Sequence, residues 1–131
     1  MEWINVNDRL PDYNESVAAV NIDEPEEIVI TQRSRRNDRS RDKNDFETWA
    51  VFEHADYWAK VEDNDWISVK NKLPLYDVPV VIKSNYETMV FGHRTKNKAV
   101  VTDENDFAIF EPDERITHWA GLPEVPKTRQ Q

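Results

Sequence analysis

An internal repeat runs through this chain of 131 residues. Residues 3–13 recur as residues 66–76, and Trp, Ile, Val, Leu, Pro and Tyr are retained at an offset of 63. Further along, Asn44-Asp45-Phe46 and Trp58-Ala59 recur at an offset of 61. Hairpin turns tolerate changes of length, so the two-residue slip is placed in the turn at residues 21–27. The sequence therefore predicts two diverged copies of one small module.

Each copy is expected to form strands, because short β-branched runs alternate with turns and no window has a long apolar stripe at helical spacing. We predict an all-β or β-dominated fold: two tandem small antiparallel β modules related by a pseudo-twofold axis and sharing an interface. The predicted strands are residues 16–22, 28–32, 46–52 and 57–59 in the first copy, and residues 78–83, 89–93, 107–110 and 117–120 in the second.

The repeat also sets the expected domain boundaries. Residues 1–62 form the first β module, with a basic loop at 33–43, and residues 63–126 form the second. Residues 127–131 are predicted to be a disordered tail.

The second copy carries two short motifs. It opens with Trp66-Ile67-Ser68-Val69 followed by Leu73-Pro74, and it closes with the run from Ile116 to Glu124, which contains Thr-His-Trp and Leu-Pro. These motifs resemble a small family of phage and prophage proteins that is catalogued as a domain of unknown function. The resemblance covers residues 65–124 well and both ends of residues 2–60 more loosely, since the first copy lacks Thr-His and Leu-Pro in its closing motif. It implies a phage or mobile-element origin and no activity.

Composition excludes several classes of site. The chain has no Cys, so disulfides, thiolate catalysis and Cys-based zinc sites are ruled out. With only two Gly it cannot form a Gly-rich phosphate-binding loop. The sequence shows no signal peptide and no apolar run long enough to span a membrane. We therefore expect a soluble protein in the cytoplasm of the bacterial host, with no cofactor, no metal and no membrane partner.

Charge is distributed unevenly. The net charge is −9, yet residues 33–43 hold six basic and two acidic residues, so the remainder of the chain carries −13. An acidic body repels nucleic acid and attracts basic protein surfaces. The residues predicted to contact such a partner are Asp103, Glu104, Asp106 and Glu111.

The basic loop has a shorter counterpart in the second copy. Together the two loops offer an alternative, anion-binding set, which consists of Arg33, Arg35, Arg36, Arg39, Arg41, Arg94, Lys96 and Lys98. The preferred interpretation is a mobile hairpin tip, because Arg-rich segments without apolar residues are usually flexible until bound.

Aromatic and titratable residues are interpreted mainly as structural. Trp3 with Trp58, and Trp66 with Trp119, are predicted to close two small cores, the alternative being exposed rings that stack on a base or anchor an interface. Trp49 is predicted to pack as well. His118 is predicted to be a half-buried hydrogen-bonding residue, and the paired acids are predicted to be solvated, so no catalytic residue is assigned.

Three classes of function follow. The leading one is a phage or prophage accessory protein that acts by binding, as an acidic inhibitor of a host defence system or host enzyme. The alternative is a nucleotide- or nucleic-acid-binding module that uses Trp faces and the two basic loops. An enzyme with an unrecognised site is third, and we expect no enzyme; a homodimer is left open.

Overall fold

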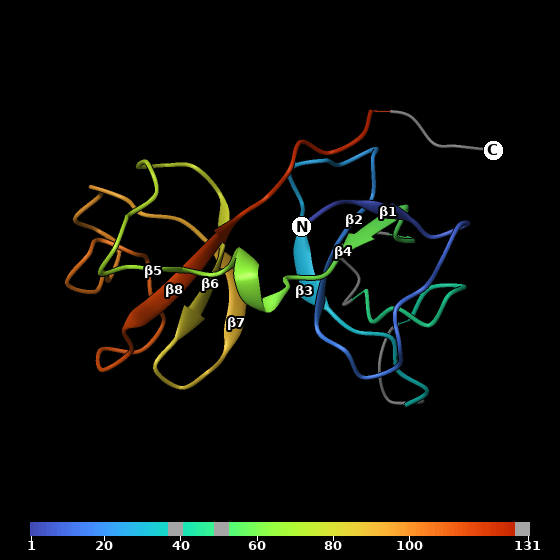
Figure 1. Ribbon diagram of the computed structural model, residues 1–131, viewed down its shortest axis with the longest axis horizontal. Helices are drawn as coiled ribbons and strands as arrows, with labels where there is room; N and C mark the ends of the chain where they lie inside the picture. The colour runs from blue at the N-terminus through green and yellow to red at the C-terminus, as the bar shows by residue number, and fades with distance from the viewer. Residues whose placement is uncertain (37–40, 49–52, 128–131) are drawn as a thin grey trace. The chain divides into compact units, whose positions relative to one another are not determined.

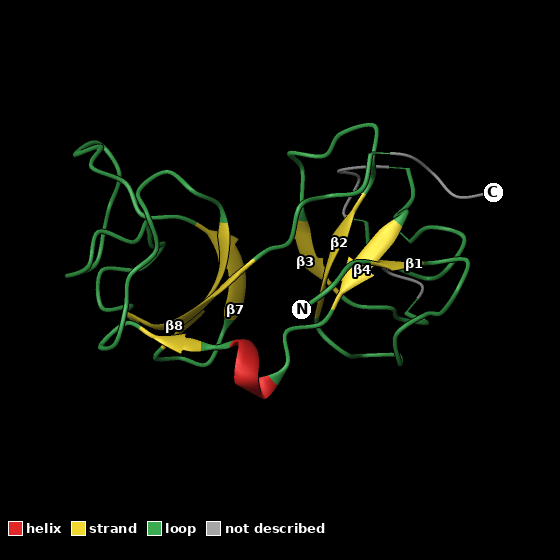
Figure 2. Ribbon diagram, turned by 45° about the horizontal axis from the view of Figure 1, so that its top comes forward, coloured by secondary structure: helices red, strands yellow, loops and turns green. Residues whose placement is uncertain are grey.

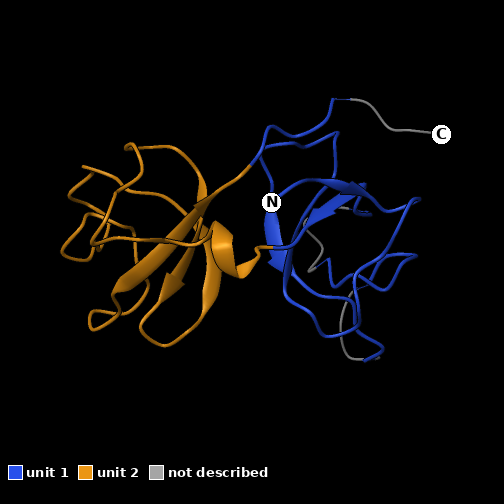
Figure 3. Cartoon of the chain, in the orientation of Figure 1, with its two compact units in different colours: residues 1–60, 123–131 blue, residues 61–122 orange. Residues whose placement is uncertain are grey.

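The computed structural model describes residues 1–36, 41–48 and 53–127. The chain divides into two compact units, of which unit 1 comprises residues 1–60 and 123–131 and unit 2 comprises residues 61–122 (Figure 3). The division falls two residues before the predicted boundary, and the segment that follows unit 2 is grouped with unit 1. Most of the predicted disordered tail, residues 128–131, lies outside the described residues.

Unit 1 is built on one four-stranded antiparallel sheet in the order β1-β4-β2-β3 (Figure 1). Its strands are β1 (Ile4–Asn5), β2 (Val17–Val20), β3 (Val29–Thr31) and β4 (Tyr57–Ala59). The last strand in sequence, β4, therefore lies between β1 and β2. The sheet is complete only when residues 57–59 have added this strand.

Unit 2 has the same topology, with its strands in the order β5-β8-β6-β7. A 3₁₀ helix, η1 (Asp63–Asp65), precedes this sheet. The strands are β5 (Ile67–Ser68), β6 (Val80–Ser84), β7 (Met89–Gly92) and β8 (Ile116–Gly121).

The register of the two sheets follows the sequence repeat. Trp58 lies between Ile4 and Ala19 in unit 1, and Trp119 lies between the equivalent residues, Ile67 and Ile82, in unit 2. The prediction of two small antiparallel β modules is confirmed. The pseudo-twofold axis and the shared interface stay predictions.

The two-residue slip lies where the sequence places it. Ala19 pairs with Val29 across the first hairpin, while Ile82 pairs with Val90 across the second, so the first loop is longer by two residues. Asn21 and Ser84 stand at equivalent positions, and each accepts a backbone N–H from two residues further on. The turns thus differ in length and start in the same way.

The third strand predicted in each copy is wrong for residues 46–48 and 107–110, and residues 49–52 lie outside the described residues. Within the described residues, Phe46 and Phe107 form only isolated bridges, to Arg33 and Arg94, and no strand runs on from them. The β-branched and aromatic residues that favoured a strand lie in loops, and from there Phe46 and Phe107 reach the core. Conversely, the opening motif of each copy forms the short edge strands β1 and β5, which were not predicted.

Each unit has its own hydrophobic core. In unit 1 Phe46 and Trp58 pack with Val6, Val17, Ala19 and Ala55, and in unit 2 Phe107 and Trp119 pack with Val80, Ile82, Ile109 and Ile116. Phe107 is carried by the loops, which lie to one side of the unit 2 sheet in both views (Figures 1 and 2). The cores are small, so each depends on a few large aromatic side chains.

Along the described parts of the chain, no helix has the length and apolar character needed to cross a membrane.

Candidate functional site

An arginine ties the loops of unit 2 together. Arg94 donates from Nε to the carbonyl of Asn105 (2.8 Å), from Nη1 to the carbonyl of Pro74 (2.8 Å) and from Nη2 to the Tyr76 hydroxyl (3.0 Å). Its guanidinium also lies 4.0 Å from the centre of the Tyr76 ring. The Tyr76 hydroxyl donates to Asp106 Oδ2 at 2.6 Å, and this hydrogen bond raises the pKa of Tyr76 above its ordinary value.

Unit 1 contains the same arrangement around Arg33. Its guanidinium donates to the carbonyls of Asn44 (2.8 Å) and Pro11 (2.9 Å) and to the Tyr13 hydroxyl (3.1 Å). Tyr13 in turn donates to Asp45 Oδ2 at 2.7 Å. Two residues that the sequence placed in the anion-binding set, Arg33 and Arg94, are thus engaged inside the fold.

A carboxylate in each unit holds a turn closed. Asp103 accepts the backbone N–H groups of Asn105 (2.9 Å), Phe107 (3.0 Å) and Ile116 (2.9 Å). Asp42 makes the equivalent three bonds in unit 1, to residues 44, 46 and 55. These bonds fix the phenylalanine of each core next to the strand that follows it.

Asp106 and Asp45 complete these turns. Both adopt a left-handed backbone with φ of 68°, which Asp tolerates better than most residues. Two of the four acids predicted to contact a partner, Asp103 and Asp106, are therefore part of the framework. The other two, Glu104 and Glu111, are exposed.

The acids of unit 2 lie among exposed apolar side chains. Residues 99–114, which we call the acidic loop, hold six acidic residues and no basic one (orange in Figure 1). On this loop Phe110 is 78% exposed and Val101 is 55% exposed, and a backbone hydrogen bond from Ile109 N to the Val101 carbonyl brings residues 101 and 109 together. Leu75, 77% exposed, lies on the neighbouring loop that Arg94 ties to this one.

The remaining cations of the anion-binding set are divided. Arg35 and Lys96 are exposed and lie over the rings of Tyr13 and Tyr76, at 4.4 Å and 4.7 Å from the ring centres. Arg41 donates to the Ser34 carbonyl and pairs with Asp45. Arg36 and Lys98 are exposed, and Arg39 lies outside the described residues.

The tryptophans separate into two kinds. Trp58 and Trp119 are 4% and 8% exposed, belong to the cores, and donate to the carbonyls of Arg9 and Lys72 at equivalent positions. Trp3 and Trp66 are half-buried and stand outside both core clusters, so the prediction that they close the cores is wrong. The reason is register, because each directly precedes the short edge strand of its sheet. Trp49 lies outside the described residues.

All three histidines are half-buried. His118 is half-buried and its Nδ1 lies 2.9 Å from the Thr117 hydroxyl, as expected of a hydrogen-bonding residue, and His93 is half-buried as well. Among residues 1–36, 41–48 and 53–127, no cluster of three or more His, Asp or Glu side chains could hold a metal ion.

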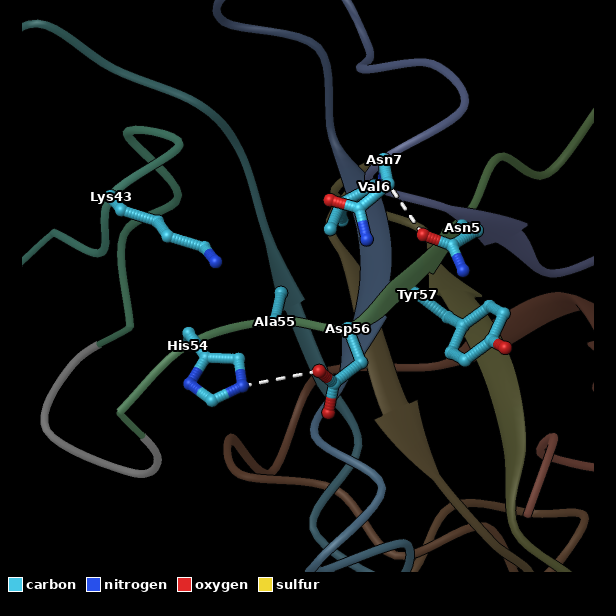
Figure 4. A pocket seen from close by; sticks show the side chains of 8 residues that line it. All are labelled: Asn5, Val6, Asn7, Lys43, His54, Ala55, Asp56 and Tyr57. Atoms are coloured by element: carbon cyan, nitrogen blue, oxygen red, sulfur yellow. Dashed lines mark hydrogen bonds and ion pairs between the residues drawn. The ribbon is translucent and has the colours of Figure 1, made fainter. Parts of the chain in front are cut away.

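A small polar pocket lies in unit 1 (Figure 4). His54 Nε2 lies 3.1 Å from Asp56 Oδ1, and Asp56 Oδ2 accepts the backbone N–H of Ile22 at 2.9 Å. Lys43 extends toward His54 from a separate loop (Figure 4). The pocket has a volume of about 90 Å³, and its wall consists of Asn5, Val6, Asn7, Lys43, His54, Ala55, Asp56 and Tyr57.

Sequence reasoning missed this pocket, although the repeat contains a signal for it. The positions equivalent to Lys43, His54 and Asp56 are Glu104, Arg115 and Thr117 in unit 2. The polar lining therefore differs between the copies, while the arginine and the aspartates of the framework are the same.

Part of the chain matches a known family model. Residues 65–127 match the model of a small family described as Protein of unknown function (DUF551). The matched region starts just before β5 and includes the whole unit 2 sheet, while residues 1–60, which form the unit 1 sheet, lie outside it. No curated protein and no solved structure matches the chain.

Proposed function

We propose that this chain is a phage or prophage accessory protein that acts by binding, and that it inhibits a host protein with a basic surface through the acidic loop of unit 2. The observation that carries the proposal is the exposure of Phe110 and Val101 within a segment of six acidic and no basic residues, in which a backbone hydrogen bond joins Ile109 to Val101. Exposed apolar side chains within a charged rim are typical of protein interaction sites.

The charge selects the class of partner. A second copy of the acidic loop would be repelled by the first. A partner with apolar residues ringed by Lys or Arg would match the acidic loop both in charge and in apolar contacts. The phage origin draws its support from the resemblance of the opening and closing motifs of unit 2 to those of phage and prophage proteins. Binding in the cytoplasm of the host is part of the same proposal.

The test is a pull-down from bacterial host lysate at low and high salt with matched charge variants. Glu104→Lys, Glu111→Lys and Asp113→Lys together reverse the exposed acids and leave Asp103 and Asp106 in place. We expect this variant to lose the partner. For the unchanged chain, we expect the rate of association with the partner to fall about tenfold as the salt concentration rises. Arg35→Gln with Arg36→Gln in unit 1 is the control, and it should keep the partner.

Nucleotide or nucleic-acid binding is the second candidate. It is favoured by the half-buried Trp3 and Trp66 and by the exposed Arg35 that stacks on Tyr13. If the Arg35/Arg36 variant loses its partner while the acid variant keeps it, the acidic-inhibitor proposal is wrong and this candidate replaces it.

A further inference from the structure

The pocket of unit 1 contains a lysine that no carboxylate of the described residues neutralises. Lys43 forms no ion pair with any acid among the described residues, although the chain as a whole carries a charge of −9. In an acidic protein a lysine is easily paired, so its position over a polar pocket calls for a physical explanation.

The framework places this lysine. The neighbouring residue, Asp42, accepts the backbone N–H groups of Asn44 and Phe46 on its own loop and of Ala55 on the opposite segment, at 2.8–3.0 Å. The backbone next to Lys43 is therefore held against the segment that carries His54. The lysine stem remains free to turn its ammonium toward the pocket (Figure 4).

The acid in the pocket is already occupied. Asp56 is 7% exposed, and each of its oxygens has a partner, His54 on one side and the backbone N–H of Ile22 on the other. The carboxylate thus orients the His54 ring from one edge and leaves the opposite ring nitrogen, Nδ1, on the other edge. The buried amide of Asn5 lies across the pocket, and its Oδ1 accepts the backbone N–H of Asn7.

We propose that this pocket binds a small oxyanion, the carboxylate or phosphate group of a ligand, at the Lys43 ammonium, and that the doubly protonated His54 ring, which donates from Nε2 to Asp56, supplies a second N–H from Nδ1. Charge-assisted hydrogen bonds of this kind are the strong ones in proteins. A volume of about 90 Å³ corresponds to about three water molecules, which is room for one such group and excludes enclosure of a whole nucleotide.

Unit 2 provides the internal control for this inference. It has the same framework, yet Glu104 stands at the lysine position, Arg115 at the histidine position and Thr117 at the aspartate position, so the lysine and histidine donors of the pocket are absent there. The site is therefore specific to unit 1 and independent of the acidic loop.

The experiment is an amide ¹H–¹⁵N NMR titration of the full chain with inorganic phosphate and, in a separate arm, with acetate at equal ionic strength. We expect shift changes confined to the residues that line the pocket, with the tighter of the two anions identifying a phosphate or a carboxylate source. Lys43→Glu should weaken binding at least tenfold, whereas Lys98→Glu, the same charge change at an exposed lysine of unit 2, should weaken it less than twofold.

Equal weakening by the two variants would mean general electrostatics and would overturn the proposal. So would shift changes spread over both units, or none in the pocket with either anion. The amide spectrum of each free variant reports whether it is folded, and an unchanged dispersion is expected because both lysines are exposed.

Discussion

Unit 1 and unit 2 have the same strand order and the same arginine–tyrosine–aspartate network, and they differ in what that framework carries. Residues 99–114 of unit 2 contain six acids and no base, whereas the equivalent residues 38–53 contain five acids and three bases. Lys43 of unit 1 corresponds to Glu104 of unit 2. Asp12 of unit 1 corresponds to Leu75 of unit 2.

This difference separates two kinds of charged residue that look alike in sequence. Arg33 and Arg94 are retained because each satisfies carbonyl groups of loops that have no strand partner, and an unsatisfied buried carbonyl is costly. The exposed positions have no such constraint and have diverged. Identity between the copies therefore indicates fold, and divergence between them indicates candidate binding surface.

The largest expected effect distinguishes two phenylalanines of one loop. Phe107 is fully buried in the core of unit 2, so Phe107→Ala should lower the free energy of unfolding by about 3–5 kcal/mol. Phe110→Ala, three residues on, should change it by less than about 0.5 kcal/mol because the side chain is exposed. Urea unfolding followed by fluorescence measures both, and comparable losses would place Phe110 in the core and remove it from the proposed interface.

The tryptophans give the next test. Trp119→Ala removes a core ring and its hydrogen bond to Lys72, and should cost about 3–5 kcal/mol, with the same loss for Trp58→Ala in unit 1. Trp66→Ala should cost only about 1 kcal/mol, since that ring is half-buried. Thermal unfolding of the three variants orders them, and an equal cost at Trp66 would show a core role for the edge tryptophans.

The turn aspartates should have a smaller effect. Asp103→Ala leaves three backbone N–H groups without their acceptor, so we expect a loss of about 2–3 kcal/mol. Glu104→Ala, at the adjacent exposed position, should be neutral within about 0.5 kcal/mol. If chemical denaturation shows the two variants to be alike, the aspartate does not hold the turn.

The smallest effect concerns the titration of Tyr76. The hydrogen bond to Asp106 raises the pKa of this tyrosine, so its stabilising contribution is present below the ordinary tyrosine pKa and is lost as pH rises through the raised value. Asp106→Asn, which tolerates the same backbone, should move the pKa back toward the ordinary value. NMR of the tyrosine ring carbons follows the titration, and an unchanged pKa in the variant would exclude Asp106 as the cause.

The repeat was sufficient to predict that the two halves share one topology, and the short β-branched runs without a helical stripe were sufficient to predict the β fold class. It did not reveal that Phe46 and Phe107 reach the core from loops, since an aromatic between polar residues has the same alternation in a strand and in a bridge. The edge strands β1 and β5 were missed because two paired residues leave almost no pattern.

The candidate sites were only partly predictable. Net charge indicated an acidic surface but did not separate Glu104 and Glu111 from Asp103 and Asp106. The roles of the latter two depend on donors brought close by the fold, which are backbone N–H groups for Asp103 and the Tyr76 hydroxyl for Asp106. The same holds for Arg33, which composition places in a basic loop and the structure places inside the framework. The pocket joins residues 5–7, 43 and 54–57, which no local motif connects.

The central claim, that retained charges make the fold and diverged charges make the surface, is tested most directly by the free energy of unfolding of four single variants. Arg33→Lys and Arg94→Lys should each lose about 2 kcal/mol, because lysine cannot reproduce the three directed donations. Lys43→Glu and Glu104→Lys, which exchange the residues of the two units, should each change it by less than about 0.5 kcal/mol. Neutral arginine variants, or an exchange that unfolds the chain, would contradict the account.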